Sequence, residues 1–449
     1  MTADFILTAA EVRHAEQAAV HAGVSEAELM NIAGTGVAAA IRAFAGAMPA
    51  LVLCGPGNNG GDGYVIARLL RAAGMEVRVA AAGEPSKEPA ASARAAWSGR
   101  VERLDDATPA PLLIDALFGT GLRRPIDAAI SSRLCALAAQ ARVSVAVDLP
   151  SGVDSDSGAI LSPVPSYDLT VATGCLKPAH LLQPAARGMG RLVVAEIGVE
   201  CQSALRRIQR PRLVAPGPDD HKYRRGYVSV QAGAMSGAAA LVAAAAARSG
   251  AGYVAVAGAE VAGTPHCVVQ NVSPDDPRIG ARVIGPGLGR NEAARALVET
   301  ALRSGVQLVL DADALHLLNA GPMLHDPILT PHAGEFTRLF DDLPGSKVEQ
   351  ARAAAALSQA TIIFKGADTV VAAPDGRAAL IAPPAWLASA GTGDVLAGVV
   401  GTMRARTLPA FEAACAGVWL HARAAELAGP HLIADDLLAQ LPVAVAECL

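Results

Sequence analysis

Short, continuous apolar segments alternate with alanine-rich stretches of helical periodicity along most of this chain. Such segments are typical of the buried strands of a parallel sheet that helices cover on both faces. We therefore expect an α/β protein made of three-layer αβα domains. The expected strands are Leu51–Cys54, Val77–Ala81, Leu112–Ile114, Val143–Val147, Leu169–Ala172 and Leu192–Ala195 in the first half, and Tyr227–Val230, Tyr253–Ala257, Val283–Ile284, Leu308–Leu310, Ile328–Leu329, Ile362–Phe364 and Val370–Ala372 in the second.

The alternation is interrupted at residues 206–220, where the sequence RRIQRPRLVAPGPDD has three prolines and no periodicity. Because 449 residues are enough for two domains with separate cores, we place a linker there. This gives a Rossmann-like N-terminal domain over residues 1–205 and a second domain over residues 221–449. The arginines of the linker could contact a phosphate, although a solvated linker is the simpler interpretation. No internal repeat relates the two halves.

The composition excludes several classes of function. Residues 1–205 have 16 Lys and Arg against 20 Asp and Glu, and residues 206–449 have 21 against 22, so neither half has the basic balance of a nucleic-acid-binding protein. Seven scattered cysteines without a C-x-x-C pair predict a reduced, cytoplasmic protein without structural zinc. The start MTADFILTAAEV lacks the features of a signal peptide, and the longest apolar stretch, Ala238–Ala247, is too short to cross a membrane. We also expect a homo-oligomer.

A glycine-rich loop, GPGNNGGDG at residues 55–63, follows the first expected strand. Such a turn before a helix presents free backbone N–H groups and suits an anionic ligand. Polar residues also follow three later strands: Asp115 before a glycine turn, Asp148 before Pro-Ser-Gly, and Lys177. Each residue alone could be a helix cap. Because these strand ends meet at one edge of a parallel sheet, together they predict a ligand site.

The residue types at this edge suggest a chemistry. Asparagine, serine and aspartate oxygens are hard ligands that suit an alkali or alkaline-earth cation, and a second carboxylate could act as a general acid or base. No G-x-G-x-x-G is followed by an acidic residue about 20 positions later, which disfavours hydride-transfer dehydrogenases.

Four motifs, GPGNNGGDGYVIAR, DALFGTGL, VDLPSGVD and LKPAHLL, occur in the order found in the NAD(P)H-hydrate epimerase family, which residues 8–200 resemble. That family interconverts the R and S hydrates of NADH and NADPH and uses K+. The sequence LMNIAG at residues 29–34 departs from the family, which usually has an acidic residue and Asn before Ala-Gly. The resemblance implies K+ ligands at Asn59, Asp115 and Ser151, a substrate surface at Asn58, Asn59, Gly60, Gly61, Asp62, Gly119, Thr120, Gly121, Leu122, Arg123, Arg124, Pro125 and Asp148, and proton transfer by Asp148.

A second glycine-rich loop, ASAGTGDVLAG at residues 388–398, contains the turn Gly391-Thr392-Gly393-Asp394. Its N–H groups could stabilise a transferring phosphoryl group while Asp394 accepts the proton of an attacking hydroxyl. A G-x-G-D turn alone is equally often a capped helix start. Further motifs support a site: GPGLGR at 285–290, LVLDADAL at 308–315, TPHAGEFTRL at 330–339, and FKGADTVVAAPDG at 364–376, which predicts a short hairpin after Lys365.

From about His221 onward the chain resembles the ADP/ATP-dependent NAD(P)H-hydrate dehydratase family, a branch of the ribokinase-like fold. No G-x-x-x-x-G-K-[ST] is present, so a P-loop enzyme is excluded. Residues 230–233 depart from the Gly-Ser pair that is usual in the family. The resemblance implies a hydrate site at Gly289, His332 and Asp394, with Glu335 beside it, an adenine-nucleotide site at Lys365, Gly366, Ala367, Asp368, Thr369, Ser389, Ala390, Gly391, Thr392 and Gly393, and Mg2+ at the nucleotide phosphates.

The two resemblances name successive steps of one repair pathway. Together they imply a bifunctional enzyme that epimerises the hydrates NADHX and NADPHX and dehydrates the S form, with ADP favoured over ATP as co-substrate. One alternative is a hydroxymethylpyrimidine-type or sugar-type kinase fused to a non-catalytic nucleotide-binding domain. Another makes the N-terminal half a scaffold, although a scaffold does not require Asn59, Asp115, Asp148 and Ser151 together.

Overall fold

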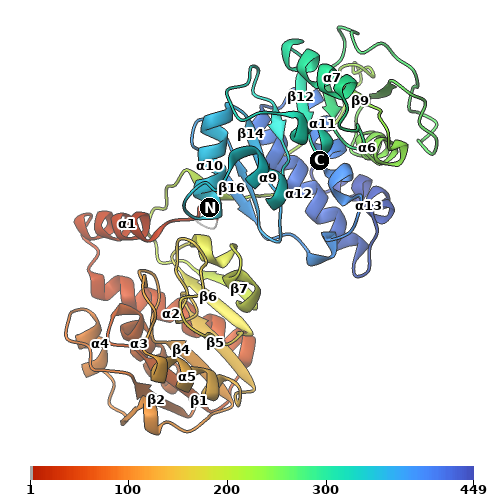
Figure 1. Ribbon diagram of the computed structural model, residues 1–449. Helices are drawn as coiled ribbons and strands as arrows, with labels where there is room; N and C mark the ends of the chain where they lie inside the picture. Colours follow the sequence, from red (N-terminus) through yellow and green to blue (C-terminus); the bar gives the residue numbers. More distant parts are fainter. Residues whose placement is uncertain (1–3) are drawn as a thin grey trace. The chain divides into compact units, whose positions relative to one another are not determined.

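The computed structural model describes residues 4–449 and divides into two compact units, residues 1–206 and 207–449 (Figure 1). Each unit is an α/β unit built on its own sheet, as the alternation of apolar and helical segments predicts. No helix within residues 4–449 has both the length and the apolar character that crossing a membrane requires.

The sheet of the first unit has seven parallel strands in the order β3-β2-β1-β4-β5-β6-β7. The strand order reverses beside β1, and ligands of open parallel sheets bind outside the carboxyl ends of strands at such a point. The strands are β1 (Ala50–Cys54), β2 (Val77–Ala81), β3 (Val101–Arg103), β4 (Leu112–Ala116), β5 (Val143–Val147), β6 (Leu169–Thr173) and β7 (Arg191–Ala195).

Helices cover both faces of this sheet because alternate strand residues point to opposite sides. Val52 and Cys54 pack in the core formed with α2 and α3. Leu51 and Leu53 pack in a second core with α5. The helices are α1 (Ala9–His21), α2 (Glu26–Ala45), α3 (Asn58–Ala72), α4 (Ala90–Ala95) and α5 (Ala128–Ala138).

The second sheet has nine strands in the order β10-β9-β11-β12-β13-β14-β15-β16-β8. The neighbours from β10 to β14 pair in parallel, whereas β14, β15 and β16 pair antiparallel and include the hairpin that the sequence predicts after Lys365. The strands are β8 (Leu205–Arg207), β9 (Tyr227–Gln231), β10 (Tyr253–Ala257), β11 (Ala281–Ile284), β12 (Gln307–Leu310), β13 (Ile328–Leu329), β14 (Thr361–Phe364), β15 (Thr369–Ala372) and β16 (Ala378–Ile381).

Alanine- and glycine-rich helices pack closely in the second unit. Gly398 of α11 lies so close to α6 that an added Cβ atom would be 2.3 Å from the Val242 carbonyl oxygen, which explains why the helix contact needs a residue without a side chain. The helices are α6 (Ser236–Arg248), α7 (Glu292–Arg303), α8 (Asp313–Leu317), α9 (Ala333–Phe340), α10 (Lys347–Ser358), α11 (Thr392–Ala405), α12 (Ala410–Ala428) and α13 (Ala434–Ala446).

Candidate functional sites

In the first unit, the predicted site residues lie around the carboxyl ends of β1, β4 and β5. The loop after β1 leads into α3 at Asn58, and an added Cβ atom at Gly60 would lie 1.8 Å from the Gly55 carbonyl oxygen. A Cβ atom at Gly119 would lie 2.9 Å from Asp148 Oδ2 and 3.0 Å from Asn59 Oδ1. The glycines therefore let backbone and polar side chains of three loops approach closely.

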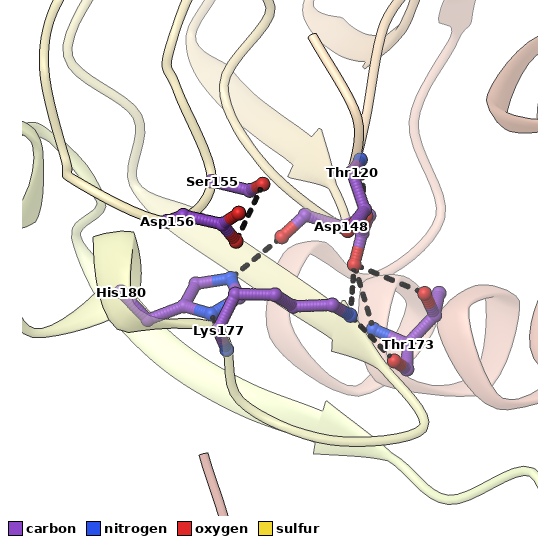
Figure 2. A network of polar contacts seen from close by, with 7 residues as sticks. All are labelled: Thr120, Asp148, Ser155, Asp156, Thr173, Lys177 and His180. Carbon is purple, nitrogen blue, oxygen red and sulfur yellow. Dashed lines mark hydrogen bonds and ion pairs between the residues drawn. The ribbon is translucent and has the colours of Figure 1, made fainter. Parts of the chain in front are cut away.

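Asp148 is the centre of a buried polar network (Figure 2). Its φ of 66° is unusual for a residue other than glycine. Thr120 donates to Oδ2 through its hydroxyl at 2.6 Å and its backbone N–H at 2.9 Å. Thr173 donates its hydroxyl to Oδ1 at 3.0 Å, and Lys177 Nζ donates to the same oxygen at 2.5 Å. The carboxylate thus has charged and neutral donors on both oxygens.

The Lys177–Asp148 ion pair is almost inaccessible to water, with side chains 1% and 7% exposed. Burial alone would raise the pKa of Asp148, but the charge and hydrogen bond of Lys177, together with the Thr120 hydroxyl, hold it well below its usual range. Burial alone would likewise lower the pKa of Lys177, and the Asp148 charge raises it. Both groups are therefore ionised at neutral pH.

His180 fixes the backbone of Asp148. Its Nδ1 accepts a hydrogen bond from the Lys177 backbone N–H at 2.8 Å, so the proton of the neutral ring lies on Nε2. Nε2 then donates to the Asp148 carbonyl oxygen at 2.7 Å. Burial and the Lys177 charge lower the pKa of His180 to about 4, which keeps the ring neutral at physiological pH.

The residues predicted to bind potassium occupy the same sheet edge. Asp115, in β4, accepts hydrogen bonds from the Ser151 hydroxyl at 2.6 Å, the Ser151 N–H at 3.0 Å, the Tyr167 hydroxyl at 2.5 Å and the Leu117 N–H at 3.1 Å. In contrast, Oδ1 and Nδ2 of Asn59 are both buried without a hydrogen-bond partner. A buried amide without partners is unusual and indicates a ligand that the protein itself does not supply.

A cavity of about 310 Å³ lies beside this network. Asn58 and Asp62 from α3 line it, as do Glu16 from α1 and Thr173, whose hydroxyl bonds to Asp148. The predicted Gly119–Pro125 segment lies in the loop between β4 and α5, where Thr120 bonds to Asp148 and the Arg123 side chain is largely exposed. Thr173, His180 and Glu16 were not among the residues predicted for the site, and Lys177 was noted without an assigned role.

In the second unit, Asp394 lies in the first turn of α11, after Gly391 with φ of 84°. Burial and the charge of Asp311 raise the pKa of Asp394 to about 7, against the opposing effect of Lys365. Thr392 caps the loop by donating its hydroxyl to the carbonyl oxygens of Leu387 and Ser389, each at 2.8 Å.

Asp311 follows β12 and forms hydrogen bonds with residues that follow β13 and β14. It was not among the predicted site residues. Its Oδ1 accepts hydrogen bonds from Lys365 Nζ at 2.8 Å and from the Thr330 hydroxyl at 2.6 Å. An added Cβ atom at Gly393 would lie 3.5 Å from Lys365 Nζ and 4.0 Å from Asp311 Oδ2. Lys365 therefore lies between a buried carboxylate and the loop that begins α11.

Other predicted residues are fixed by local contacts. His332 and Glu335 form a reciprocal cap at the start of α9, with N–H to side-chain distances of 2.9 and 3.2 Å. The Gly289 N–H donates to Asp313 at 2.9 Å. Asp368, in the Lys365–Thr369 segment, forms a 2.7 Å ion pair with Lys347.

Comparison with known proteins identifies the family. Residues 26–179 match the family model described as YjeF-related protein N-terminus, and residues 228–441 match that of NAD(P)H-hydrate dehydratase. The bifunctional NAD(P)H-hydrate repair enzyme Nnr of Coxiella burnetii is 34% identical over 481 residues, covering 97% of this chain and 98% of that protein. The chain belongs to the bifunctional NAD(P)H-hydrate repair enzymes.

Other members of this repair-enzyme family are similarly related. The enzyme of the same name from Mycobacterium tuberculosis H37Rv is 36% identical over 427 residues, covering 89% of each chain. Among solved structures, the ADP/ATP-dependent NAD(P)H-hydrate dehydratase from Bacillus subtilis co-crystallised with ATP/Mg2+ is 30% identical, with 53% of this chain and 95% of that chain covered and a TM-score of 0.49. The near-complete match to bifunctional repair enzymes confirms the two resemblances seen in the sequence.

Proposed function

We propose that this chain repairs hydrated nicotinamide nucleotides in two steps. Residues 1–205 interconvert the R and S hydrates of NADH and NADPH, and residues 221–449 return the S hydrate to the reduced cofactor. The observation that carries the proposal is the match to bifunctional repair enzymes over 97% of the chain, with one sheet-edge site in each unit. This continuous match also argues against a kinase fused to an unrelated scaffold.

In the second domain, Asp394 is the general base of the dehydration. The hydroxyl of the hydrate gives its proton to Asp394 while its oxygen attacks the terminal phosphorus of ADP, and the bond from that phosphorus to the departing AMP breaks. Phosphate then leaves more readily than hydroxide would, the neighbouring ring carbon loses a proton to water, and the ring double bond is restored. A carboxylate with a pKa of about 7 is well matched to proton transfer at neutral pH.

Nucleotide binding is proposed for Lys365–Thr369 and Ser389–Gly393. The Gly391–Gly393 turn at the start of α11 supports this assignment, because free N–H groups at a helix N-terminus attract phosphate. Lys365 Nζ, close to Gly393, adds positive charge there. Gly289 and His332, with Glu335 holding His332, are proposed for the hydrate. We favour ADP over ATP, and bound Mg2+ would offset the charge of the nucleotide phosphates.

In the first domain, Asn58–Asp62 and Gly119–Pro125 are proposed to bind the substrate around Asp148. The cavity lined by Asn58 and Asp62, and the bond from Thr120 to Asp148, support this placement. Asp148 contributes a fixed negative charge, because its donors keep it ionised. A carboxylate stabilised in this way is a weak proton acceptor, so the proton-transfer role that the sequence suggested for Asp148 is better filled by another group.

Potassium is proposed to bind Asn59, Asp115 and Ser151. The partnerless amide of Asn59 fits an ion that coordinates its oxygen, and a bound cation would also supply positive charge beside the buried Asp115. Each oxygen of Asp115 already accepts two hydrogen bonds. Direct coordination by Asp115 therefore requires that one of those donors turn away. Self-association and a cytoplasmic location stay predictions from the sequence.

A single assay tests the two activities. A mixture of R and S NADH hydrates is incubated with the full chain, ADP, Mg2+ and K+, and the absorbance of the reduced nicotinamide ring is followed. We expect complete recovery of NADH, faster than spontaneous epimerisation permits. Recovery that stops at the S fraction would contradict the epimerase assignment, and no recovery with either ADP or ATP would contradict the dehydratase assignment.

A further inference from the structure

The cavity beside Asp148 contains two carboxyl groups that the ion pair does not include. Asp62 and Glu16 both line the 310 Å³ space, and Thr173 lines it as well. Because the Thr173 hydroxyl donates to Asp148 at 3.0 Å, the cavity is separated from the ion pair by one side chain. A substrate ring in the cavity would thus contact Asp62 and Glu16 directly. The Asp148 charge would lie one side chain further away, behind Thr173.

The surroundings of Asp62 and Asp148 have opposite effects on their protonation. Burial raises the pKa of Asp62 well above its usual range, and the charges of Asp148 and Glu16 raise it further against the effect of Lys177. Lys177 and Thr120 hold the pKa of Asp148 far below its usual range despite burial. Two neighbouring carboxyl groups with such different pKa values are typical of a proton donor and a permanent anion in one site.

We propose that Asp62 is the proton donor and acceptor of the epimerase reaction, while Asp148, held by Lys177, serves only as a fixed negative charge. This inference rests on the proposed epimerase function. It differs from the assignment suggested by the sequence, in which Asp148 transfers the proton.

The proposed step balances in both directions. The Asp62 carboxyl proton goes to the hydroxyl on the ring carbon next to nitrogen, and the carbon–oxygen bond breaks as the nitrogen lone pair forms a carbon–nitrogen double bond. Water leaves, the ring becomes positive, and Asp62 becomes negative. Water then adds to the opposite face of the ring and returns a proton to Asp62, which inverts the carbon. The Asp148 anion stabilises the transient positive ring electrostatically.

The first test is Asp62→Asn in the full chain, assayed on pure R hydrate without ADP so that only epimerisation occurs. We expect the epimerisation kcat to fall by about a hundredfold or more, with a normal rate of S-hydrate dehydration once ADP is added. Calorimetry of the unfolding transition of the first domain checks that the variant folds. A kcat within a few-fold of the unsubstituted enzyme would overturn the proposal.

The second test uses Glu16→Gln and does not depend on a loss of activity. The charged and titratable groups around Asp62 are Arg13, Glu16 and His21 of α1, Glu26 of α2, Asp148 and Lys177. Because the proton donor must be protonated, epimerisation should decline as pH rises through the pKa of Asp62. Removing the Glu16 charge lowers that pKa, so the decline should move to lower pH.

Glu28→Gln is the matched control, since Glu28 lies exposed in the first turn of α2, and its profile should not move. An unshifted profile for Glu16→Gln would overturn the proposal, as would complete loss of its epimerisation, which would identify Glu16 as the proton donor. If the unsubstituted chain does not epimerise the hydrate at all, the proposed function itself fails, and this result is distinct from either outcome with the variants.

Discussion

Replacing Lys177 by methionine would leave the Asp148 carboxylate buried without its counter-charge. The two side chains are 1% and 7% exposed and their charged atoms are 2.5 Å apart, so water cannot take the place of the lysine. Removing one partner of a buried ion pair costs about 3–5 kcal/mol. For a domain of this size each kcal/mol lowers the unfolding temperature by roughly 2–4 °C. We therefore expect the first domain to unfold about 10 °C lower in Lys177→Met.

Calorimetry of the full chain measures this effect. Added ADP should raise the unfolding temperature of the second domain, and this identifies which transition belongs to which domain. The double variant Lys177→Met/Asp148→Asn should recover most of the lost stability, because no uncompensated charge remains. Arg103→Met is the control, since its ion pair with Asp105 is largely exposed and should contribute less than about 1 kcal/mol. A double variant as unstable as Lys177→Met, or a single variant that loses less than about 1 kcal/mol, would refute the reasoning.

The pH dependence gives a further check on the same variant. Without Lys177, burial raises the pKa of Asp148 above its value in the unfolded chain. The folded state then binds the proton more tightly, so the variant gains stability as pH falls through the raised pKa. The unsubstituted enzyme has a lowered pKa at Asp148, so this residue contributes the opposite slope and its stabilisation is lost in acid.

Three further predictions concern the other groups. Asp394→Asn should reduce dehydration by about a hundredfold or more while epimerisation continues, as measured by separate assays with and without ADP. Dehydration should rise with pH through about 7 as Asp394 ionises. Asp311→Asn should move this rise to lower pH, because it removes a negative charge beside Asp394. Asp326 lies before β13, and the control Asp326→Asn should leave the pH of the rise unchanged. Potassium in place of sodium should raise the unfolding temperature of the first domain, and an equal response in Asn59→Leu would contradict the proposed site.

Much of the fold could be predicted because each buried parallel strand is a continuous apolar segment of the sequence. All thirteen predicted segments coincide with strands, and the hairpin after Lys365 is confirmed. The strands that were missed are short and lie toward the edges of their sheets: β3 (Val101–Arg103), β16 (Ala378–Ile381) and β8 (Leu205–Arg207). Two of the three residues in β3, Val-Glu-Arg, are charged, since an edge strand is partly solvated, and no apolar run marks this strand.

The sequence locates the carboxylates of the sites but does not indicate their protonation, which depends on partners far away along the chain. Asp148 directly follows β5, and Asp394 lies in the first turn of α11, after a glycine-rich loop. From the sequence, both residues are candidate bases. Lys177, 29 residues away, makes the first a permanent anion, whereas Asp311, at a distant strand end, helps to raise the pKa of the second to about 7. In the proposed mechanism, the same residue type at similar places in two α/β units therefore performs opposite tasks. A motif identifies where a carboxylate lies, and only its folded neighbours decide whether it holds a charge or moves a proton.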